Sequence, residues 1–371
     1  MTRILHTADL HLADGHPERW EALEAVVAAA SQREADALLV AGDLLDRGSD
    51  HAALRPRIRA AFEAFAGEVF LLPGNHDLSA YRPGQDWGPR THLLVGAPVV
   101  EARTGGVRLV GVPFPAEPIR FSRLRQELAE RLEGEAPAVL VLHGTLIDAA
   151  APEILDESRA DEPGPYFPVR TEELRGLGAA YVALGHHHQH AERPVGGGAV
   201  AAYAGSPSPV GSHARGPRRA VLLEVGADGS GGPGGAAVRP VRLPVPYRER
   251  RERWLDPFEE ESGLEALERE LEEAADPACS MRVRVDGILA GMTEAAVRTR
   301  VEALAERLGP SYAELAFDLE GVGLDPARAD LFRDFSRRLD ERLEAAAQEG
   351  EPIDAGVGRR ALELAARALK T

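Results

Sequence analysis

The first half of the chain alternates short, continuously apolar runs with longer segments whose apolar residues recur every three or four positions. The short runs predict strands that are covered on both faces. They comprise residues 3–7, 37–41, 69–72, 107–112, 139–142 and 181–184. Between the first two runs lies a predicted helix whose apolar face comprises Trp20, Leu23, Val27 and Ala30. A second helix is predicted over residues 54–65, and this alternation predicts a layered α/β domain.

The pattern changes after Gly185, where the apolar runs follow one another without intervening helical segments. The expected elements are strands over 199–203 and 220–225, a glycine-rich loop over 226–235 and a returning strand over 238–245. We therefore place the first domain boundary near Pro246, so that the first domain spans residues 1–246.

The rest of the chain predicts a small α/β domain over residues 247–324 and a helical tail over 325–371. The small domain is expected to contain a helix over 264–274, a strand over 281–285, a helix over 293–308 with Thr293 as its N-cap, and a strand over 312–319. In the tail, the first predicted helix carries an apolar stripe of Leu331, Phe335, Leu339 and Leu343. Gly350 and Pro352 interrupt the pattern before a second helix over 353–369. The stripe is compatible with binding a partner and with packing on the chain's own small domain.

Composition limits the partners and the compartment. The 371 residues have a formal charge of −17, which argues against broad adhesion to nucleic acid through net charge but leaves room for a local basic groove. Arginines at 248, 250, 251 and 253 form either a local basic patch or a solvated linker.

Cys279 is the sole cysteine, so an internal disulfide and a cysteine-rich zinc site are excluded. Without a signal peptide or a membrane-spanning apolar stretch, we expect a cytoplasmic protein with no membrane association.

Five widely spaced segments carry the chemistry. They are Asp9-Leu10-His11, Gly42-Asp43-Leu44-Leu45-Asp46, Gly74-Asn75-His76-Asp77, His143-Gly144 and Gly185-His186-His187-His188. Each follows a predicted strand, so we expect their side chains on loops at one edge of one sheet. Two divalent cations about 4 Å apart can clamp a phosphodiester and activate water, and they need a carboxylate between them.

Asp43 is the candidate for the bridging carboxylate. The other candidate ligands are Asp9, His11, Asn75, His143, His186 and His188. This mixture of oxygen and nitrogen donors favours Mn²⁺, Fe or Zn²⁺ over Ca²⁺. His76 is predicted to be catalytic, assisting the leaving oxygen, with Asp46 as the carboxylate that fixes its tautomer.

These motifs resemble the calcineurin-like metallophosphoesterase superfamily, and their order and spacing resemble its nuclease branch, the Mre11/SbcD-like DNA repair exonucleases. The resemblance is dense over residues 1–225, where it includes the segments 6–12, 181–186 and 203–207, and is architectural beyond Pro246. It implies an α/β/β/α metallophosphoesterase sandwich with a small α+β cap domain and a C-terminal helical tail.

The same resemblance implies the site and the partners. One ion would be held by Asp9, His11, Asp43 and His188, and the other by Asp43, Asn75, His143 and His186. The metal would be Mn²⁺ and the substrate DNA. The protein would form a homodimer and bind a Rad50/SbcC-like coiled-coil ATPase through the helix pair after Asp325.

Three other functions compete with a nuclease. A serine/threonine phosphatase shares the segment 42–48, but Leu12 and Asp77 stand where that group has Gly and Glu. A small-molecule phosphodiesterase, acting on cyclic nucleotides or nucleotide-linked substrates, shares the ligands and generally lacks a region like that after Pro246. A non-catalytic scaffold for an ATPase is disfavoured by the presence of both His76 and Asp46. The polarity of digestion, the strand preference and the ATP dependence stay open.

Overall fold

The computed structural model groups the chain into two compact units, Met1–Tyr247 and Arg248–Thr371. It describes residues 1–82, 84–147, 167–211, 214–226, 235–256, 259–287, 289, 291–323, 326–348 and 355–370. Most of the predicted glycine-rich loop, and the predicted break at Gly350 and Pro352, lie outside these residues.

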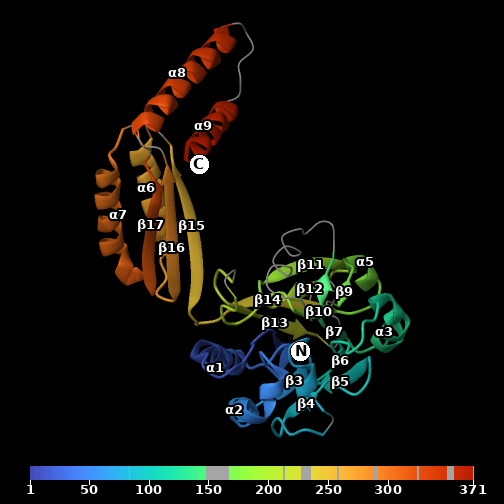
Figure 1. Cartoon of the computed structure of the whole chain (residues 1–371). Coiled ribbons are helices and arrows are strands. Elements are labelled where there is room, and N and C mark those ends of the chain that lie inside the picture. The colour runs from blue at the N-terminus through green and yellow to red at the C-terminus, as the bar shows by residue number, and fades with distance from the viewer. Residues whose placement is uncertain are drawn as a thin grey trace. The chain divides into compact units, whose positions relative to one another are not determined.

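The first unit contains two six-stranded sheets (Figure 1). The first sheet, in spatial order, consists of β14 (Ala236–Arg242), β13 (Arg219–Val225), β1 (Thr2–Thr7), β2 (Ala37–Ala41), β3 (Glu68–Leu72) and β4 (Thr91–Leu93). The second consists of β11 (Ala191–Gly196), β12 (Ala199–Tyr203), β10 (Tyr181–Gly185), β7 (Ala138–His143), β6 (Val107–Val112) and β5 (Val100–Thr104). A small separate ladder joins β8 (Thr145–Leu146) to β9 (Pro168–Val169).

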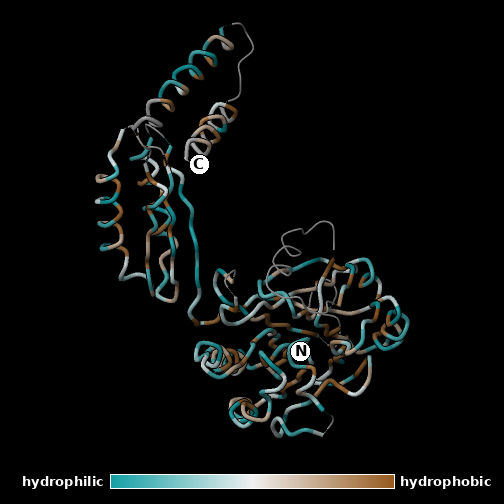
Figure 2. The backbone as a smooth tube through the Cα atoms, viewed as in Figure 1, coloured by the Kyte–Doolittle hydropathy of each residue, from teal (hydrophilic) through white to brown (hydrophobic). Residues whose placement is uncertain are grey.

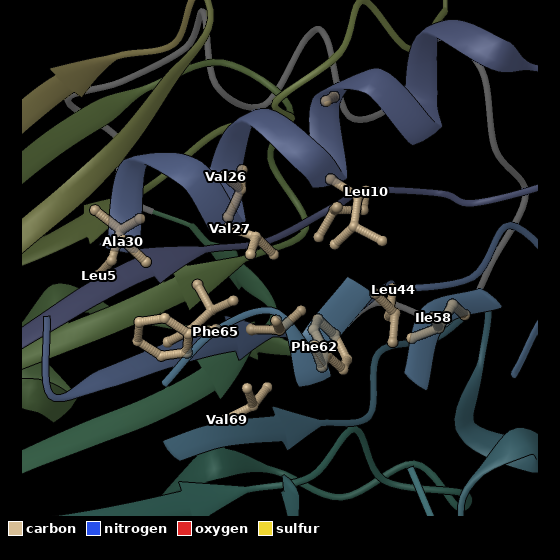
Figure 3. Packing of buried hydrophobic residues seen from close by; sticks show 14 of the residues in the cluster. Leu5, Leu10, Val26, Val27, Ala30, Leu44, Ile58, Phe62, Phe65 and Val69 are labelled. Atoms are coloured by element: carbon tan, nitrogen blue, oxygen red, sulfur yellow. The ribbon is translucent and has the colours of Figure 1, made fainter. Parts of the chain in front are cut away.

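Helices cover the outer face of each sheet. The described helices of this unit are α1 (Pro17–Gln32), α2 (His51–Glu63), α3 (Arg125–Leu132) and α5 (Thr171–Leu174), with 3-10 turns η1 (Gly48–Asp50), η2 (Leu78–Ala80) and η3 (Phe121–Arg123). Figure 3 shows α1 and α2 packed on the first sheet, where Val26, Val27 and Phe62 contact its apolar residues. Leu128 of α3 packs in the same way on the second sheet.

Successive side chains along a strand point to opposite faces of its sheet, so alternate residues form the layer between the two sheets. In β2, Leu38 and Val40 face the helices, whereas Leu39 faces the second sheet and packs with Val139 and Tyr181. All five of these side chains are at most 1% exposed. The predicted α/β/β/α sandwich is therefore confirmed, and its strands are buried on both faces as their apolar runs predicted.

The strand directions bring the two sheets' loops together. β1, β2, β3 and β4 run parallel in the first sheet, and β6, β7, β10 and β12 run parallel in the second. Because the carboxyl ends of parallel strands lie at one edge of a sheet, each sheet presents its post-strand loops there. Our expectation that a single sheet carries the site is wrong: Asp9, Asp43 and Asn75 follow strands of the first sheet, and His143 and His186 belong to the second.

The second unit contains a three-stranded sheet in the order β15 (Tyr247–Leu255), β16 (Cys279–Gly287) and β17 (Glu314–Val322). It also contains α6 (Glu260–Glu273), α7 (Glu294–Leu308) and the 3-10 turn η4 (Gly309–Ser311). Thr293 caps α7 as predicted, because its hydroxyl accepts a hydrogen bond from Ala296 N at 3.2 Å.

β15 departs from the sequence-based expectation. The segment that holds the four predicted patch or linker arginines is an edge strand, so this unit begins with a strand where we expected a helix. Figure 2 draws most of this strand in the hydrophilic colour. Charged side chains are common on edge strands, where they hinder pairing with other chains, and they hide the apolar alternation that would have predicted the strand.

The tail forms α8 (Pro326–Gln348) and α9 (Ala355–Lys370). On α8, Phe332 and Ser336 are buried, and Phe332 packs with Trp254 of β15 and with Leu362 of α9. In the predicted stripe, Leu331 and Phe335 are 66% and 39% exposed, whereas Leu339 and Leu343 are half-buried. The stripe therefore does not pack as a whole on the small domain, and binding of a partner stays a prediction. Among the described helices, none has both the length and the apolar character needed to cross a membrane.

Candidate metal centre

All seven predicted ligands converge where the two sheets' post-strand loops meet. The clearest bond between the sheets joins Asp9 to His186, whose backbone N–H lies 2.9 and 3.1 Å from the two carboxylate oxygens. Asp9, His11, Asp43 and His143 are at most 1% exposed. The site is therefore a buried cluster built from both sheets.

The backbone of the centre is strained. Asp9, His11, Asp43 and His186 have φ values of +55°, +47°, +49° and +100°. Only one other non-glycine residue in the described part of the chain, Glu34, has a positive φ. Side chains other than glycine avoid this region, and such residues concentrate at functional sites when the surrounding structure holds them there. Loop hydrogen bonds do so here, from Asp9 N to Gly42 O at 3.1 Å and from His11 N to Asp43 O at 3.0 Å.

Two glycines allow the ligand loops to approach one another. A Cβ atom on Gly42, whose φ is +96°, would overlap the imidazole of His143. A Cβ atom on Gly74 would overlap the carboxylate of Asp43. Any larger residue at either position would push a ligand out of place.

The seven predicted ligands include two overlapping groups of donor atoms. In the first, ligand atoms of Asp9, His11 and His188 lie within 4.8 Å of one another, with the two Nε2 atoms of the histidines 3.1 Å apart. In the second, Asp9, Asp43 and His143 meet the same criterion. A third set that meets it, His11, Asp43 and His76, shows that the predicted catalytic histidine lies beside the ligands.

Asn75 extends the second group. Its Oδ1 atom lies 3.0 Å from His143 Nε2 and 3.1 Å from His186 Nδ1. Asp43 Oδ2 lies 3.2 Å from His143 Nε2 and 3.8 Å from His11 Nε2, between the two groups. The donors thus converge on two positions, and Asp43 has the placement that a bridging ligand needs.

The electrostatics suit cations. Burial raises the pKa of Asp9, His143 opposes this effect and the Asp43 carboxylate adds to it, and the net pKa is about 6. Burial also disfavours the charged forms of Asp43 and His143, but their attraction outweighs it. The pKa of Asp43 falls well below its ordinary value, and that of His143 rises to about 9. A proton on His143 therefore occupies a position where a metal would provide the positive charge, so the residues fit a pair of divalent cations.

The predicted pairing of Asp46 with His76 differs from the observed contacts. His76 Nδ1 lies 2.9 Å from the backbone carbonyl oxygen of Asp46, not from its carboxylate. The carboxylate instead lies 3.5 Å from His11 Nδ1 and accepts a hydrogen bond from Arg19 at 3.0 Å. These contacts hold the pKa of Asp46 well below its ordinary value. The sequence placed both residues in the site but assigned the carboxylate to the wrong imidazole.

Two residues that hold the ligand loops in place, Arg19 and Asp77, were not predicted from the sequence. Arg19 of α1 donates to the carbonyl oxygen of His11 at 2.5 Å as well as to Asp46, so it ties two loops together. Asp77 is fully buried and accepts hydrogen bonds from Gly74 N at 2.8 Å and Leu45 N at 3.1 Å. Asp77 adjoins His76 in the sequence, which signals a role, whereas Arg19 lies in a helix and belongs to no motif.

A comparison with known protein families decides the class of the protein. Residues 2–190 match the model of the calcineurin-like phosphoesterases, and all seven ligands fall inside this match. The chain belongs to the calcineurin-like phosphoesterase family. It is thus a metal-dependent hydrolase of phosphoester bonds, in a family that uses two divalent metals.

Several solved structures are similar to this one. The protein TT1561 of Thermus thermophilus is 15% identical, covers 65% of this chain and 98% of its own, and has a TM-score of 0.41. A dimetal phosphatase from Danio rerio is 11% identical and covers 60% and 92%, with a TM-score of 0.38. Yfce, a phosphoesterase from E. coli, is 16% identical and covers 65% and 100%, with a TM-score of 0.31.

Proposed function

We propose that this phosphoesterase is a two-metal DNA nuclease of the Mre11/SbcD-like branch that uses Mn²⁺. The observation that carries the proposal is the second unit. A buried phosphoesterase centre is joined in one chain to a separate α/β unit that ends in two helices. An enzyme that acts on a small phosphomonoester or diester has no need of such an additional unit. A polymeric substrate extends beyond the scissile bond, so an additional unit can contact it.

The centre's residues have distinct roles in this proposal. Asp9, His11, Asp43 and His188 would hold one cation, and Asp43, Asn75, His143 and His186 the other. When bound, the two cations lower the pKa of water and offset the charge that develops on a phosphoryl group.

His76 would provide the proton for the leaving oxygen. Its Nδ1 atom faces a carbonyl oxygen, which can only accept, so Nδ1 carries a hydrogen. Nε2 is then the atom that exchanges a proton, and the protonated ring can donate from it to the oxygen that leaves phosphorus. The neighbouring backbone supports this placement, because His76 N donates to Asp43 Oδ1 at 3.0 Å.

The partners are part of the same proposal. The exposed Leu331 and Phe335 on α8 favour docking of a Rad50/SbcC-like coiled-coil ATPase on the tail, although Phe332 packs within its own unit. Exposed large apolar side chains on one helix face are typical of a surface that a partner covers. We also propose a homodimer and a cytoplasmic location.

A substrate comparison tests the function. The purified chain is incubated with Mn²⁺ and end-labelled DNA, a phosphopeptide or a cyclic dinucleotide, with Asp43→Ala as the inactive control. We expect DNA cleavage that depends on Mn²⁺ and is absent in Asp43→Ala. Preferential hydrolysis of the cyclic dinucleotide or the phosphopeptide would reject the nuclease and support one of the competing enzymes.

A further inference from the structure

A cavity lined by arginines adjoins the metal centre. Its volume is about 210 Å³. Its walls include His188 and Gln189 from the end of the last ligand segment, and Arg215, Arg218 and Arg219 from the segment that leads into β13. None of the described residues that line it carries a carboxylate. Such a concentration of positive charge contrasts with the chain's net charge of −17.

The arginine segment is anchored to the ligand segment. When the Gln189 amide is assigned with its nitrogen toward the carbonyl oxygen of Arg215, it pairs with the main chain of Arg215: the nitrogen lies 3.0 Å from that oxygen, and the amide oxygen lies 2.9 Å from Arg215 N. Arg218 is 3% exposed, and its guanidinium donates to the carbonyl oxygens of Arg215 and Gly216. Because Gln189 directly follows His188, these bonds fix the segment relative to the metal centre. A cavity held in this way is organised before a ligand arrives.

Two of the three arginines are available to a ligand. Arg218 uses its donors on the main chain and acts as a support. Arg215 is exposed and Arg219 is half-buried. In the part of the chain that the structure describes, neither forms an ion pair with a carboxylate. A guanidinium is a planar fork of donors that matches the oxygens of a phosphate group.

We propose that Arg215 and Arg219 bind the phosphate next to the scissile phosphate of a polynucleotide. This subsite rests on the proposed nuclease function, because a polynucleotide strand has a further phosphate next to the scissile one, whereas a simple diester such as bis(p-nitrophenyl) phosphate has none. The cavity shares His188 with the centre, so a strand whose scissile phosphate lies at the metals would extend over it. The arginines therefore add affinity for a nucleic acid and add little for a small diester.

The double variant Arg215→Gln/Arg219→Gln tests the subsite against a charge-matched control, Arg33→Gln/Arg103→Gln. Arg103 is exposed and Arg33 is half-buried, as Arg215 and Arg219 are in turn, and both control residues lie near Arg3 and Thr2, at the opposite end of the first strand from Asp9. Two properties are measured: binding of a fluorescein-labelled 12-nucleotide oligothymidylate without divalent metal at several salt concentrations, and hydrolysis of the oligonucleotide and of bis(p-nitrophenyl) phosphate with Mn²⁺.

We expect the double variant to bind the oligonucleotide about tenfold more weakly than wild type. Its slope of log affinity against log salt should be shallower by about 0.7 for each phosphate that the protein no longer neutralises. Its kcat/KM for the oligonucleotide should fall at least tenfold more than its kcat/KM for the small diester. The control variant should match wild type in affinity, salt slope and hydrolysis.

The outcomes separate the subsite from the nuclease. Unchanged oligonucleotide affinity and salt slope in the double variant would overturn the subsite, even if wild type cleaves DNA. An equal loss on both substrates would also overturn it, because the arginines would then act at the scissile phosphate or on the fold. Weaker binding in the double variant, with a wild type that hydrolyses the small diester and leaves DNA intact, would show that the arginines contact nucleic acid, but it would reject the nuclease and with it the place of this contact beside a scissile phosphate.

Discussion

Four residues of the metal centre adopt a left-handed backbone conformation that side chains other than glycine avoid. Each such residue costs about 1–3 kcal/mol, so the loops keep this shape only because hydrogen bonds between neighbouring loops hold it. Asp77 accepts one such bond from Leu45 N and a second, within its own loop, from Gly74 N, and Arg19 of α1 donates to the loops that carry His11 and Asp46. At the residue scale, the ligands are therefore oriented by side chains that do not themselves face the cations.

Replacing His76 with alanine should abolish most cleavage and leave metal binding intact. Its side chain contacts the Asp46 carbonyl and is not required to hold either cation in our assignment. Loss of a general acid costs about 10²–10⁴-fold in rate. Single-turnover cleavage with elemental analysis of the same sample measures both properties. Unchanged cleavage, or loss of the metals, would reject the role.

Replacing Asp46 with asparagine should weaken metal binding, because its carboxylate orients His11 from the opposite ring nitrogen. Loss of such a partner typically costs about 10–100-fold in metal affinity. Titration of the metal-free variant with Mn²⁺ by calorimetry gives the affinity. If the affinity were unchanged and only the rate fell, Asp46 would act on His76 after all.

The sequence identified the seven converging residues because each directly follows an apolar strand and has a chemistry that suits a cation. It could not assign the partner of His76, because a backbone carbonyl has no signature in a sequence. Arg19 was missed for a similar reason: its neighbours on α1 form an ordinary amphipathic pattern, and its role depends on which loop the helix faces.

At the scale of elements, the layer between the two sheets fixes the distance between the two sets of ligands. Leu39 of β2 and Val139 of β7 meet in this layer, and each lies a few residues before a predicted ligand. Full burial of a leucine contributes about 1.5–3 kcal/mol. The packing between the strands thus positions the loops that follow them.

Replacing Leu39 with alanine should lower the free energy of unfolding of the first unit by about 2–5 kcal/mol, since it leaves a cavity between the sheets. Leu39→Ile conserves the volume and should cost less than about 1.5 kcal/mol. Urea denaturation followed by tryptophan fluorescence measures both variants. Equal stability of the alanine and isoleucine variants would contradict the tight packing of this layer.

Element positions followed the apolar pattern closely where strands are buried on both faces, as in β2 and β12, whose bounds match the prediction. β15 was missed because an edge strand with charged residues on both faces has no apolar alternation. On α8, the i, i+4 stripe could not show which face is buried: Phe332 packs against Trp254 and Leu362, whereas Leu331 and Phe335 of the stripe are exposed.

At the scale of the whole molecule, the buried metal centre makes the stability of the protein depend on pH and on bound metal. His143 keeps its proton more tightly in the folded protein, with a pKa of about 9 against an ordinary 6.5. Its contribution to stability is thus fully present below pH 6.5 and is lost as the pH rises toward 9. The histidines with lowered pKa values, His6, His187, His188 and His190, have lost their protons above pH 6.5 in both states and do not offset this loss.

The metal-free protein should therefore become less stable between pH 6.5 and 9, by an amount on the order of a few kcal/mol. Bound metal replaces the proton, so the metal-loaded protein should lose less over the same range. Thermal unfolding with EDTA or Mn²⁺ at a series of pH values measures this difference. A metal-free protein whose melting temperature stays constant or rises over this range would show that His143 is not held protonated.

The central claim is that residues from both sheets hold two neighbouring cations. Anomalous diffraction from crystals soaked in Mn²⁺ tests it most directly. We predict two peaks about 3.5–4 Å apart, with the Asp43 carboxylate between them and the six other ligands around them. A single peak, or peaks away from these residues, would contradict the account.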